Sequence, residues 1–381
     1  GAQGVLRAPL PLRLLPARVH RRARREQNAL RVNLVRRPIM PWPQATKYFG
    51  RSSPRLDGPA KAAGRARYTA DVELPGMLHG AIIRSTWPAA HIRAIRLDKV
   101  LAAPGIRAAI TAQDGAFDVR YYGAELAAVA GVSRQAVRDA LALVEIDAEP
   151  LPFVVDELEA LRTDAARVVP ARANLTDGRA QASADVDAAF AASAAVVEGT
   201  FETQVEFHHP LEPHGHTAAW EGDELTTWSS TQAVFGCRSA FAQALKIPQN
   251  KVRVICEHMG GGFGSKFNPG AEGILCAKLA RVAGAPVKLI LTRFEQALAV
   301  GNRPSSHQQI KLGADASGKL TAFQIESFGT SGYDAGANTG GGSGSARFPA
   351  PYIYKVPETR VKQGTVAINA GLSCAMRSPG H

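Results

Sequence analysis

The sequence has few cysteines and no long apolar run, and these absences argue against several classes of protein. Its four cysteines, Cys237, Cys256, Cys276 and Cys374, are far apart and form no C-x-x-C pair. This spacing argues against a zinc ribbon or a disulfide framework. No apolar stretch approaches the roughly 20 residues that a membrane-spanning helix needs. With 45% hydrophobic residues among 381, the chain can bury a sizeable core in two or three domains.

Acidic residues are almost absent from the first 39 positions, which hold ten arginines and only Glu26. This segment carries +9 of the net charge of +12 and leaves +3 for the remaining residues. A basic arm can bind nucleic acid or anionic lipid, but this one has no interleaved aromatic residues and no apolar core of a secretory signal. Because like charges repel and resist burial, we expect residues 1–49 to be a disordered tail. The tail is either a functional arm or translated upstream sequence, since the first methionine is Met40.

Apolar runs and turn signals from residue 50 onward predict an α+β chain. We expect a β-rich domain over residues 50–162, a connection over 163–195 with little pattern, and a second domain over 196–381. The second domain is expected to contain a hairpin over 217–228. A strand–loop–helix–strand unit over 252–292 has a length that suits a crossover between parallel strands. Residues 329–346, with seven glycines, have the composition of a flexible linker.

The stretch at 260–266 reads Gly-Gly-Gly-Phe-Gly-Ser-Lys and lies between an expected strand and an expected helix. Glycines let the backbone take left-handed dihedrals and approach a ligand that a Cβ would exclude. A Walker A loop is excluded because Ser265 stands where glycine is needed and Phe267 where a hydroxyl is needed. The dinucleotide fingerprint fails too, since its third glycine and its acidic partner are missing. A tight strand-to-helix turn remains the simplest alternative to a ligand loop.

Four histidines fall within residues 208–216, in a segment that also contains two prolines and Glu212. Such a run could supply zinc ligands, but no cysteine lies near it in the sequence. We therefore favour a structural, hydrogen-bonding turn and keep a metal site as the alternative.

In order along the chain, four motifs together resemble the molybdenum-binding large subunit of the xanthine dehydrogenase/aldehyde oxidase family. They lie at residues 210–214 (Pro-Leu-Glu-Pro-His), 230–232 (Ser-Thr-Gln), 260–266 and 375–381 (Ala-Met-Arg-Ser-Pro-Gly-His). Residues 55–71 and 151–155 resemble the α/β-hammerhead domain of the same family. The ending at 379–381 is most similar to the bacterial aldehyde oxidoreductase branch, and the resemblance covers about residues 50–381.

The resemblance implies an α+β fold in which an N-terminal α/β-hammerhead domain precedes the first half of a mixed α+β molybdopterin-binding domain. In the family the glycine loop lies against the pterin cofactor, the glutamine hydrogen-bonds a molybdenum oxygen, and the arginine lies close to the metal. Backbone N–H groups and an arginine fork suit such oxyanion contacts. No protein ligand to the metal is expected. The implied cofactor-binding residues are Gln232, Gly261, Gly262, Phe263, Gly264 and Arg377.

The implied reaction is oxidation of an aldehyde to a carboxylic acid at a molybdenum–molybdopterin centre, expected in its cytosine dinucleotide form. Iron–sulfur clusters and FAD would lie on a small and a medium partner subunit, in the cytoplasm or, after export with a signal-bearing partner, the periplasm. Phe267 stands where purine-hydroxylating members carry glutamate, which favours aldehydes over purines; the expected substrate is a small aldehyde or N-heterocycle. No nucleic-acid or membrane partner is expected. The alternatives are a purine or N-heterocycle hydroxylase subunit, an inactive gene fragment, and a nucleic-acid-binding protein that rests on residues 1–39 alone.

The family's general base is a glutamate near the end of the large subunit, which we expect beyond residue 381. Glu212, Glu272 and Glu295 offer no evident substitute in the sequence. We therefore predict that the 381-residue chain alone binds the cofactor weakly or not at all and oxidises no aldehyde. Elemental analysis for molybdenum and dye reduction with an aromatic aldehyde test this prediction, and appreciable turnover would overturn it.

Overall fold

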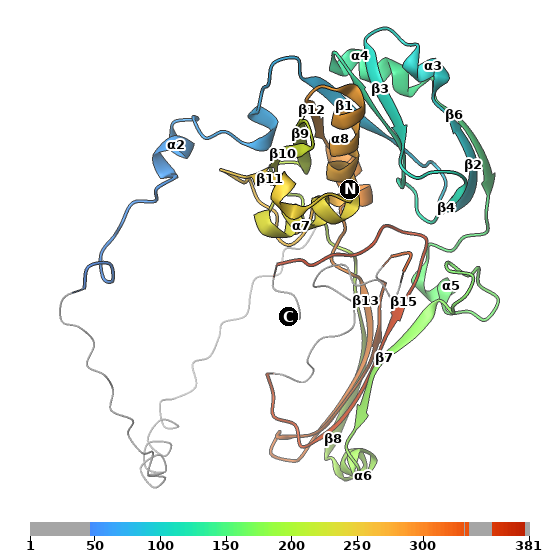
Figure 1. The fold of residues 1–381 in the computed structure, drawn as a ribbon. Helices are drawn as coiled ribbons and strands as arrows, with labels where there is room; N and C mark the ends of the chain where they lie inside the picture. Colours follow the sequence, from blue (N-terminus) through green and yellow to red (C-terminus); the bar gives the residue numbers. More distant parts are fainter. Residues whose placement is uncertain (1–45, 331, 335–352, 378–381) are drawn as a thin grey trace, which may run out of the picture. The chain divides into compact units, whose positions relative to one another are not determined.

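The computed structural model describes residues 46–330, 332–334 and 353–377 (Figure 1). Most of the expected basic tail and most of the glycine-rich stretch at 329–346 lie outside these residues. The chain divides into two compact units, residues 1–59 and residues 60–381. The described part of the first unit contains turns and the start of a short helix, α2 (Gly58–Ala62), none of whose residues is buried.

The largest sheet has seven strands in the order β11-β10-β9-β12-β1-β5-β3. Their bounds are β1 (Leu78–Arg84), β3 (Ile106–Thr111), β5 (Glu125–Gly131), β9 (Gly215–Glu221), β10 (Glu224–Ser229), β11 (Val252–Ile255) and β12 (Val287–Ile290). Three strands come from the segment expected to be a hammerhead domain and four from the segment expected to bind the cofactor. The two sets meet where β1 pairs in parallel with β12. The two predicted segments therefore share one continuous sheet.

The expected crossover is confirmed, with a hairpin inserted between its strands. Strand β11 runs parallel to β10, and β9 is antiparallel to both β10 and β12. Strands β11 and β12 are therefore parallel, joined through helix α8 (Gly270–Ala283), with β9 and β10 between them. The predicted hairpin turn is also confirmed, and Gly222 supplies its positive φ of 60°. As a result, the ends of β10, β11 and β12 and the start of β9 lie along one edge of the sheet.

Two helices bury their apolar residues against the seven-stranded sheet. Helix α8 packs on β9, β12 and β5, and helix α7 (Val234–Leu245) packs on β11. Phe241 of α7 and Leu279 of α8 have no exposed surface, and they join Leu289 of β12 in one core cluster. Burying such a side chain stabilises the fold by roughly 1.5–3 kcal/mol. This core fixes the sheet edge from which the loops leave.

A three-stranded sheet and two helices complete the N-terminal part of the second unit. The strands are β4 (Phe117–Val119), β2 (Ala90–Arg96) and β6 (Glu145–Pro150), in that order. Helices α3 (Asp98–Leu101) and α4 (Arg134–Leu141) pack against β3. Ser133 caps the start of α4, because its Oγ accepts a hydrogen bond from the Ala136 amide at 3.1 Å.

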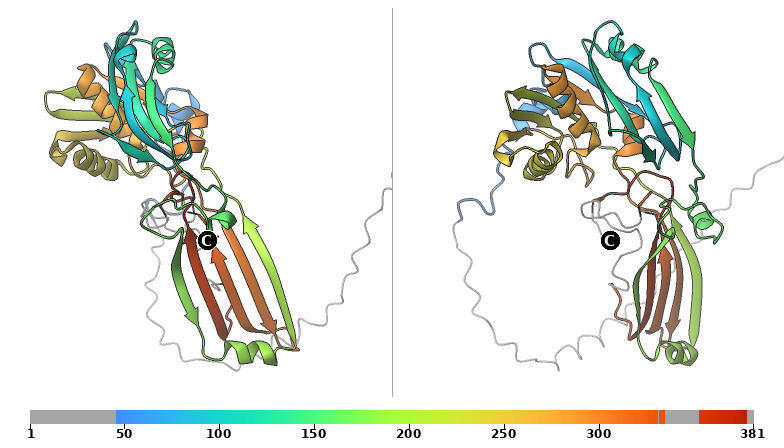
Figure 2. Two further views of the ribbon diagram at one scale, coloured as in Figure 1. Left: turned by 90° about the vertical axis from the view of Figure 1, so that its right-hand side faces the viewer. Right: turned by 45° about the vertical axis from the view of Figure 1, so that its right-hand side comes forward.

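The third sheet includes one strand, and is accompanied by one helix, that the sequence did not predict. Its strands lie in the order β7-β15-β14-β13-β8, with helix α6 between β7 and β8 (Figure 2). The bounds are β7 (Leu175–Ala182), α6 (Val186–Ala192), β8 (Ala195–Thr203), β13 (Ser306–Ala314), β14 (Leu320–Phe328) and β15 (Glu358–Val366). Strand β7 and helix α6 fall within residues 163–195, which we expected to be a connection with little pattern. Strand β7 is an edge strand whose mostly exposed, polar residues pair through the backbone, so it shows no apolar alternation.

Four short elements complete the described fold: η2 (Thr69–Asp71), α5 (Glu157–Ala160), η3 (Gln249–Lys251) and α9 (Arg293–Ala299). Mixed sheets covered by helices confirm the α+β class predicted from the sequence. Within the described ranges, no helix is both long enough and apolar enough to cross a membrane.

Candidate functional site

Three of the sequence motifs meet at one edge of the seven-stranded sheet. Residues 210–214 lead into β9, residues 230–232 follow β10, and residues 256–269 join β11 to α8. Ligand sites in such sheets commonly form at the carboxyl ends of parallel strands. A fourth segment, residues 374–377, reaches the same place after β15. Its position is fixed by a contact of 2.6 Å between His208 Nε2 and the carbonyl oxygen of Ala375.

Two buried charged side chains, Lys266 and Glu212, tie these three motifs together. Lys266 has no exposed surface, and its Nζ donates to the Glu212 carbonyl oxygen at 2.8 Å and to Ser230 Oγ at 2.6 Å. Glu212 Oε2 accepts from Ser230 Oγ at 2.8 Å and from the Gly260 amide at 2.7 Å, and it lies 3.6 Å from Lys266 Nζ. Burial lowers the pKa of Lys266 to about 8, although the nearby Glu212 carboxylate opposes this shift. Each motif is thereby linked to the other two.

Gln232 lies against the glycine loop through its amide oxygen. Gln232 Oε1 accepts hydrogen bonds from the Gly264 amide at 2.8 Å and the Lys266 amide at 3.3 Å. The Gln232 backbone amide donates to the Lys266 carbonyl oxygen at 2.8 Å. Gln232 is exposed, and its Nε2 donates to no acceptor within the described part of the chain. The side chain is thus held by its oxygen, which leaves its N–H groups available to a ligand.

The loop glycines are required by the protein's own packing, which differs from our expectation that they leave room for a ligand. An added Cβ at Gly260 would lie 2.5 Å from the Cβ of Glu212. At Gly262 it would lie 2.5 Å from Gln232 Oε1, and at Gly264 2.1 Å from the carbonyl oxygen of Ala375. Gly264 also has a φ of 115°, which side chains with a Cβ rarely adopt. Three glycines therefore let three neighbouring segments approach the loop closely.

Phe263 adopts a strained backbone conformation and is linked to Arg377. Its φ is 55°, an unusual value for a bulky residue, and such outliers cluster at functional sites. The carbonyl oxygen of Phe263 accepts a hydrogen bond from the Arg377 amide at 2.6 Å. The Arg377 carbonyl oxygen in turn accepts from Arg303 Nη2 at 2.9 Å. Both Phe263 and Arg377 are exposed.

All six residues predicted from the sequence therefore form one cluster. Gly261, with a φ of 101°, completes it, because an added Cβ there would lie 3.1 Å from the ring of Phe263. The backbone amides of Gly261, Gly262 and Phe263 donate to no acceptor among the residues that the structure describes. Three successive free N–H groups beside a free amide and an exposed guanidinium match the donor set of an anion-binding concavity. The residues present thus fit a ligand rich in oxygen atoms and negative charge.

The histidines of residues 208–216 have separate structural roles. Burial lowers the pKa of His214 to about 4 and that of His216 to about 3, so both are neutral near pH 7. His216 Nδ1 lies 2.8 Å from Ser229 Oγ, and His214 contacts Gln296 Oε1 at 3.3 Å. Among the described residues, no group of three or more His, Cys, Asp or Glu side chains could hold a metal ion. Hydrogen bonds hold these histidines in the segment that leads into β9, in line with the structural role favoured from the sequence.

A buried acidic residue, Glu272, lies at the start of α8. Its carboxylate folds over Gly270, where an added Cβ would lie 2.1 Å from Glu272 Oε2. Burial raises the pKa of Glu272 from 4.5 to about 7. Glu125 and Glu295 are also nearby and both are paired with Arg84, at 2.8 Å and 2.9 Å.

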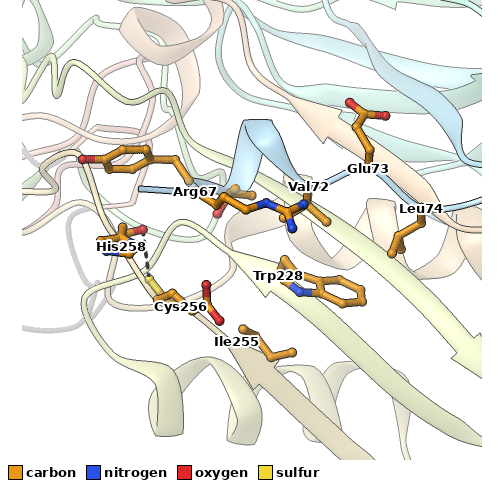
Figure 3. Close-up of a pocket in the computed structure, with 11 residues that line it drawn as sticks. Arg67, Val72, Glu73, Leu74, Trp228, Ile255, Cys256 and His258 are labelled. Atoms are coloured by element: carbon orange, nitrogen blue, oxygen red, sulfur yellow. Dashed lines mark hydrogen bonds between the residues drawn. The ribbon is translucent and has the colours of Figure 1, made fainter. Parts of the chain in front are cut away.

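A hollow lies beside the cluster and is shown in Figure 3. Trp228 and Ile255, near the ends of β10 and β11, form part of its wall together with Arg67 and His258. None of the six predicted residues lines it. It adjoins the charged pair through Thr69, whose amide donates to Glu212 Oε1 at 3.4 Å.

Comparison with known proteins identifies the class of protein that this fold and donor set represent. Residues 170–381, more than half of the chain, match the family model of the molybdopterin cofactor-binding domain. Residues 63–152 match the a/b hammerhead domain of aldehyde oxidase and xanthine dehydrogenase. The chain belongs to the family of molybdenum-binding large subunits of these oxidoreductases.

Individual relatives agree with this assignment. The chain is 29% identical to the aldehyde oxidoreductase molybdenum-binding subunit PaoC of Escherichia coli (strain K12), over 88% of this chain and 46% of the relative. It is 31% identical to the nicotinate dehydrogenase large molybdopterin subunit of Eubacterium barkeri, over 87% of this chain and 82% of that relative. Quinoline 2-oxidoreductase from Pseudomonas putida 86 superposes with a TM-score of 0.75 at 26% identity, covering 87% of this chain and 46% of that one. The chain thus spans about half the length of several relatives that it matches.

The raised pKa of the buried Glu272 side chain can be tested through the pH dependence of the protein's stability. Because the folded state raises its pKa to about 7, the stabilising contribution of its proton is full below about pH 4.5 and is lost as the pH rises through 7. Glu272→Gln cannot titrate. Its thermal midpoint should therefore rise relative to the wild type between pH 5 and pH 8, by the equivalent of at most roughly 3 kcal/mol. A difference that stays level across this range would contradict the raised pKa.

Proposed function

We propose that this chain holds a molybdenum–molybdopterin cofactor, in its cytosine dinucleotide form, at the cluster formed by Gln232, residues 261–264 and Arg377. The observation that carries the proposal is the set of unused hydrogen-bond donors in this cluster. A cofactor of this kind has oxygen atoms and phosphate groups, which accept hydrogen bonds from backbone amides and from arginine. When bound, the cofactor would supply the redox chemistry, and the chain would supply binding, orientation and electrostatics.

Each residue of the cluster would have a separate task. The free amides of Gly261, Gly262 and Phe263 would bind oxygen atoms of the cofactor. Gln232, held by its Oε1, would donate from Nε2 without adding charge. Arg377 would contribute a positive charge near the oxyanions. The exposed ring of Phe263 would shield one side of the bound group from water.

We propose that the enzyme containing this chain oxidises aldehydes to carboxylic acids. The exposed side chain of Phe267 supports this choice, because purine-hydroxylating members of the family carry a glutamate at this position. An aromatic side chain offers an apolar contact and no charge with which to bind a purine. The second candidate is an N-heterocycle hydroxylase, favoured by the similarity to a nicotinate dehydrogenase subunit over 82% of that relative.

The proposal includes partners, location and domain organisation. Electrons would pass to an iron–sulfur subunit and a FAD-binding subunit, and relatives named as subunits of oxidoreductases support this view. We place the complex in the cytoplasm, or in the periplasm after export with a signal-bearing partner, without nucleic-acid or membrane partners. We propose a hammerhead domain over residues 50–162 and a cofactor domain that includes residues 196–381; residues 163–195 join them and contribute strand β7 to a sheet of the second domain. The two matched family models, at 63–152 and 170–381, support a division of this kind.

Gln232→Leu tests the proposed cofactor site. The change removes both the acceptor for the Gly264 amide and the free N–H donors, so the loop loses an anchor and the cofactor loses a contact. When the enzyme that contains this chain is purified from a host that makes the cofactor, we expect at least a tenfold lower molybdenum content per chain. The matched control is Gln243→Leu, which changes an exposed glutamine of α7 and should retain molybdenum. Equal molybdenum content in the two variants would contradict the proposed site.

A further inference from the structure

We propose that Lys266 and Glu212 are positioning residues that hold the glycine loop and Gln232 in the arrangement that binds the cofactor. The inference rests on the proposed function and extends it to two side chains that cannot touch a ligand themselves. Lys266 has no exposed surface and Glu212 is 9% exposed. Whatever these residues contribute to binding must therefore act through the groups that they contact.

The two residues fix opposite ends of the loop. Glu212 Oε2 accepts from the Gly260 amide, and the Glu212 amide donates to the Gly260 carbonyl oxygen at 3.2 Å. These two hydrogen bonds fix the start of the loop to residues 210–214. Lys266 fixes its end, because the side chain extends into the interior to the Glu212 carbonyl oxygen and to Ser230 Oγ. The residues between them, 261–264, include the three free amides.

Lys266 also determines where Gln232 lies. Its carbonyl oxygen accepts hydrogen bonds from the Gln232 amide at 2.8 Å and from Thr231 Oγ1 at 2.9 Å, and its amide donates to Gln232 Oε1. Backbone and side chain of Gln232 are therefore both bonded to the backbone of Lys266. A movement of Lys266 would carry Gln232 with it.

The charges make this arrangement sensitive to the loss of either residue. A buried charge that loses its counter-charge and its hydrogen bonds is strongly destabilising, whereas removal of both charges together is often tolerated. Lys266→Met would leave the Glu212 carboxylate buried beside Gly260 without a cation. Reorganisation around that carboxylate would first affect the loop that it holds.

Hydrogen exchange of the backbone amides tests the inference in the full chain without added cofactor. In Lys266→Met we expect amides of residues 260–266 to exchange at least tenfold faster than in the wild type, while those of β9 and β12 are unchanged. The molybdenum content of the enzyme that contains this chain, purified from a cofactor-producing host, should fall at least tenfold. The matched control is Lys288→Met, which removes another buried lysine, bonded to Ala70 and Glu73. It should leave exchange at 260–266 unchanged.

A rescue experiment separates positioning from a general structural role. Adding Glu212→Gln to Lys266→Met removes the unpaired carboxylate and keeps an amide oxygen that can accept from Gly260. We expect the double variant to recover most of the loop protection and molybdenum content that the single variant loses. If Lys266→Met fails to fold, Glu212→Gln alone is compared with the wild type by the same two measurements.

Three results would overturn the inference. Unchanged exchange at 260–266 in both single variants would show that the pair does not position the loop. A double variant no better than Lys266→Met would indicate a packing role. Faster loop exchange with normal molybdenum content would mean that the loop is not the cofactor site. That last result contradicts the proposed function itself, whereas the first two leave it standing if Gln232→Leu loses molybdenum.

Discussion

A lysine and a glutamate buried beneath a glycine loop are the interaction on which the candidate site depends. Charged side chains are seldom buried unless they are paired and hydrogen-bonded. Here the charged groups of Lys266 and Glu212 have their hydrogen-bond partners only when residues 210–214, 230–232 and 260–266 lie together. The sheet brings these segments to one edge, and the pair then restricts how they can meet. Loops that would otherwise be free to move acquire a defined arrangement.

The glycines follow from the same constraint. Because Glu212, Gln232 and Ala375 approach the loop from different segments, an added Cβ at Gly260, Gly262 or Gly264 would collide with protein atoms. Among the described residues, the amides of Gly261, Gly262 and Phe263 have no acceptor, although the loop glycines are closely packed. This combination of crowding and unused donors distinguishes it from a flexible turn. It also explains why a strained residue, Phe263, persists within it, because surrounding contacts can hold a conformation that is unfavourable in isolation.

Much of the fold and the cluster could be predicted from the sequence, and the omissions have physical reasons. The hairpin at 217–228 and the crossover at 252–292 have strong local patterns, and the motif resemblance identified Gln232 and Arg377. That three N-terminal strands join the larger sheet through β1 and β12 is a long-range pairing without a local signal. Strand β7 lacked apolar alternation because it lies at an edge. The Lys266–Glu212 pair was missed as well, although a lone carboxylate between prolines and a lysine ending a glycine run could have suggested it.

The proposed cofactor site is tested most directly by measuring which backbone amides the bound cofactor protects from hydrogen exchange. Hydrogen exchange would be compared at single-residue resolution for the enzyme that contains this chain, with and without molybdopterin cofactor. We expect slower exchange in the cofactor-bound form at Gly261, Gly262 and Phe263, whose amides have no protein acceptor among the described residues. Protection confined to the neighbouring hollow, at Trp228 and His258, would place the ligand elsewhere and contradict it.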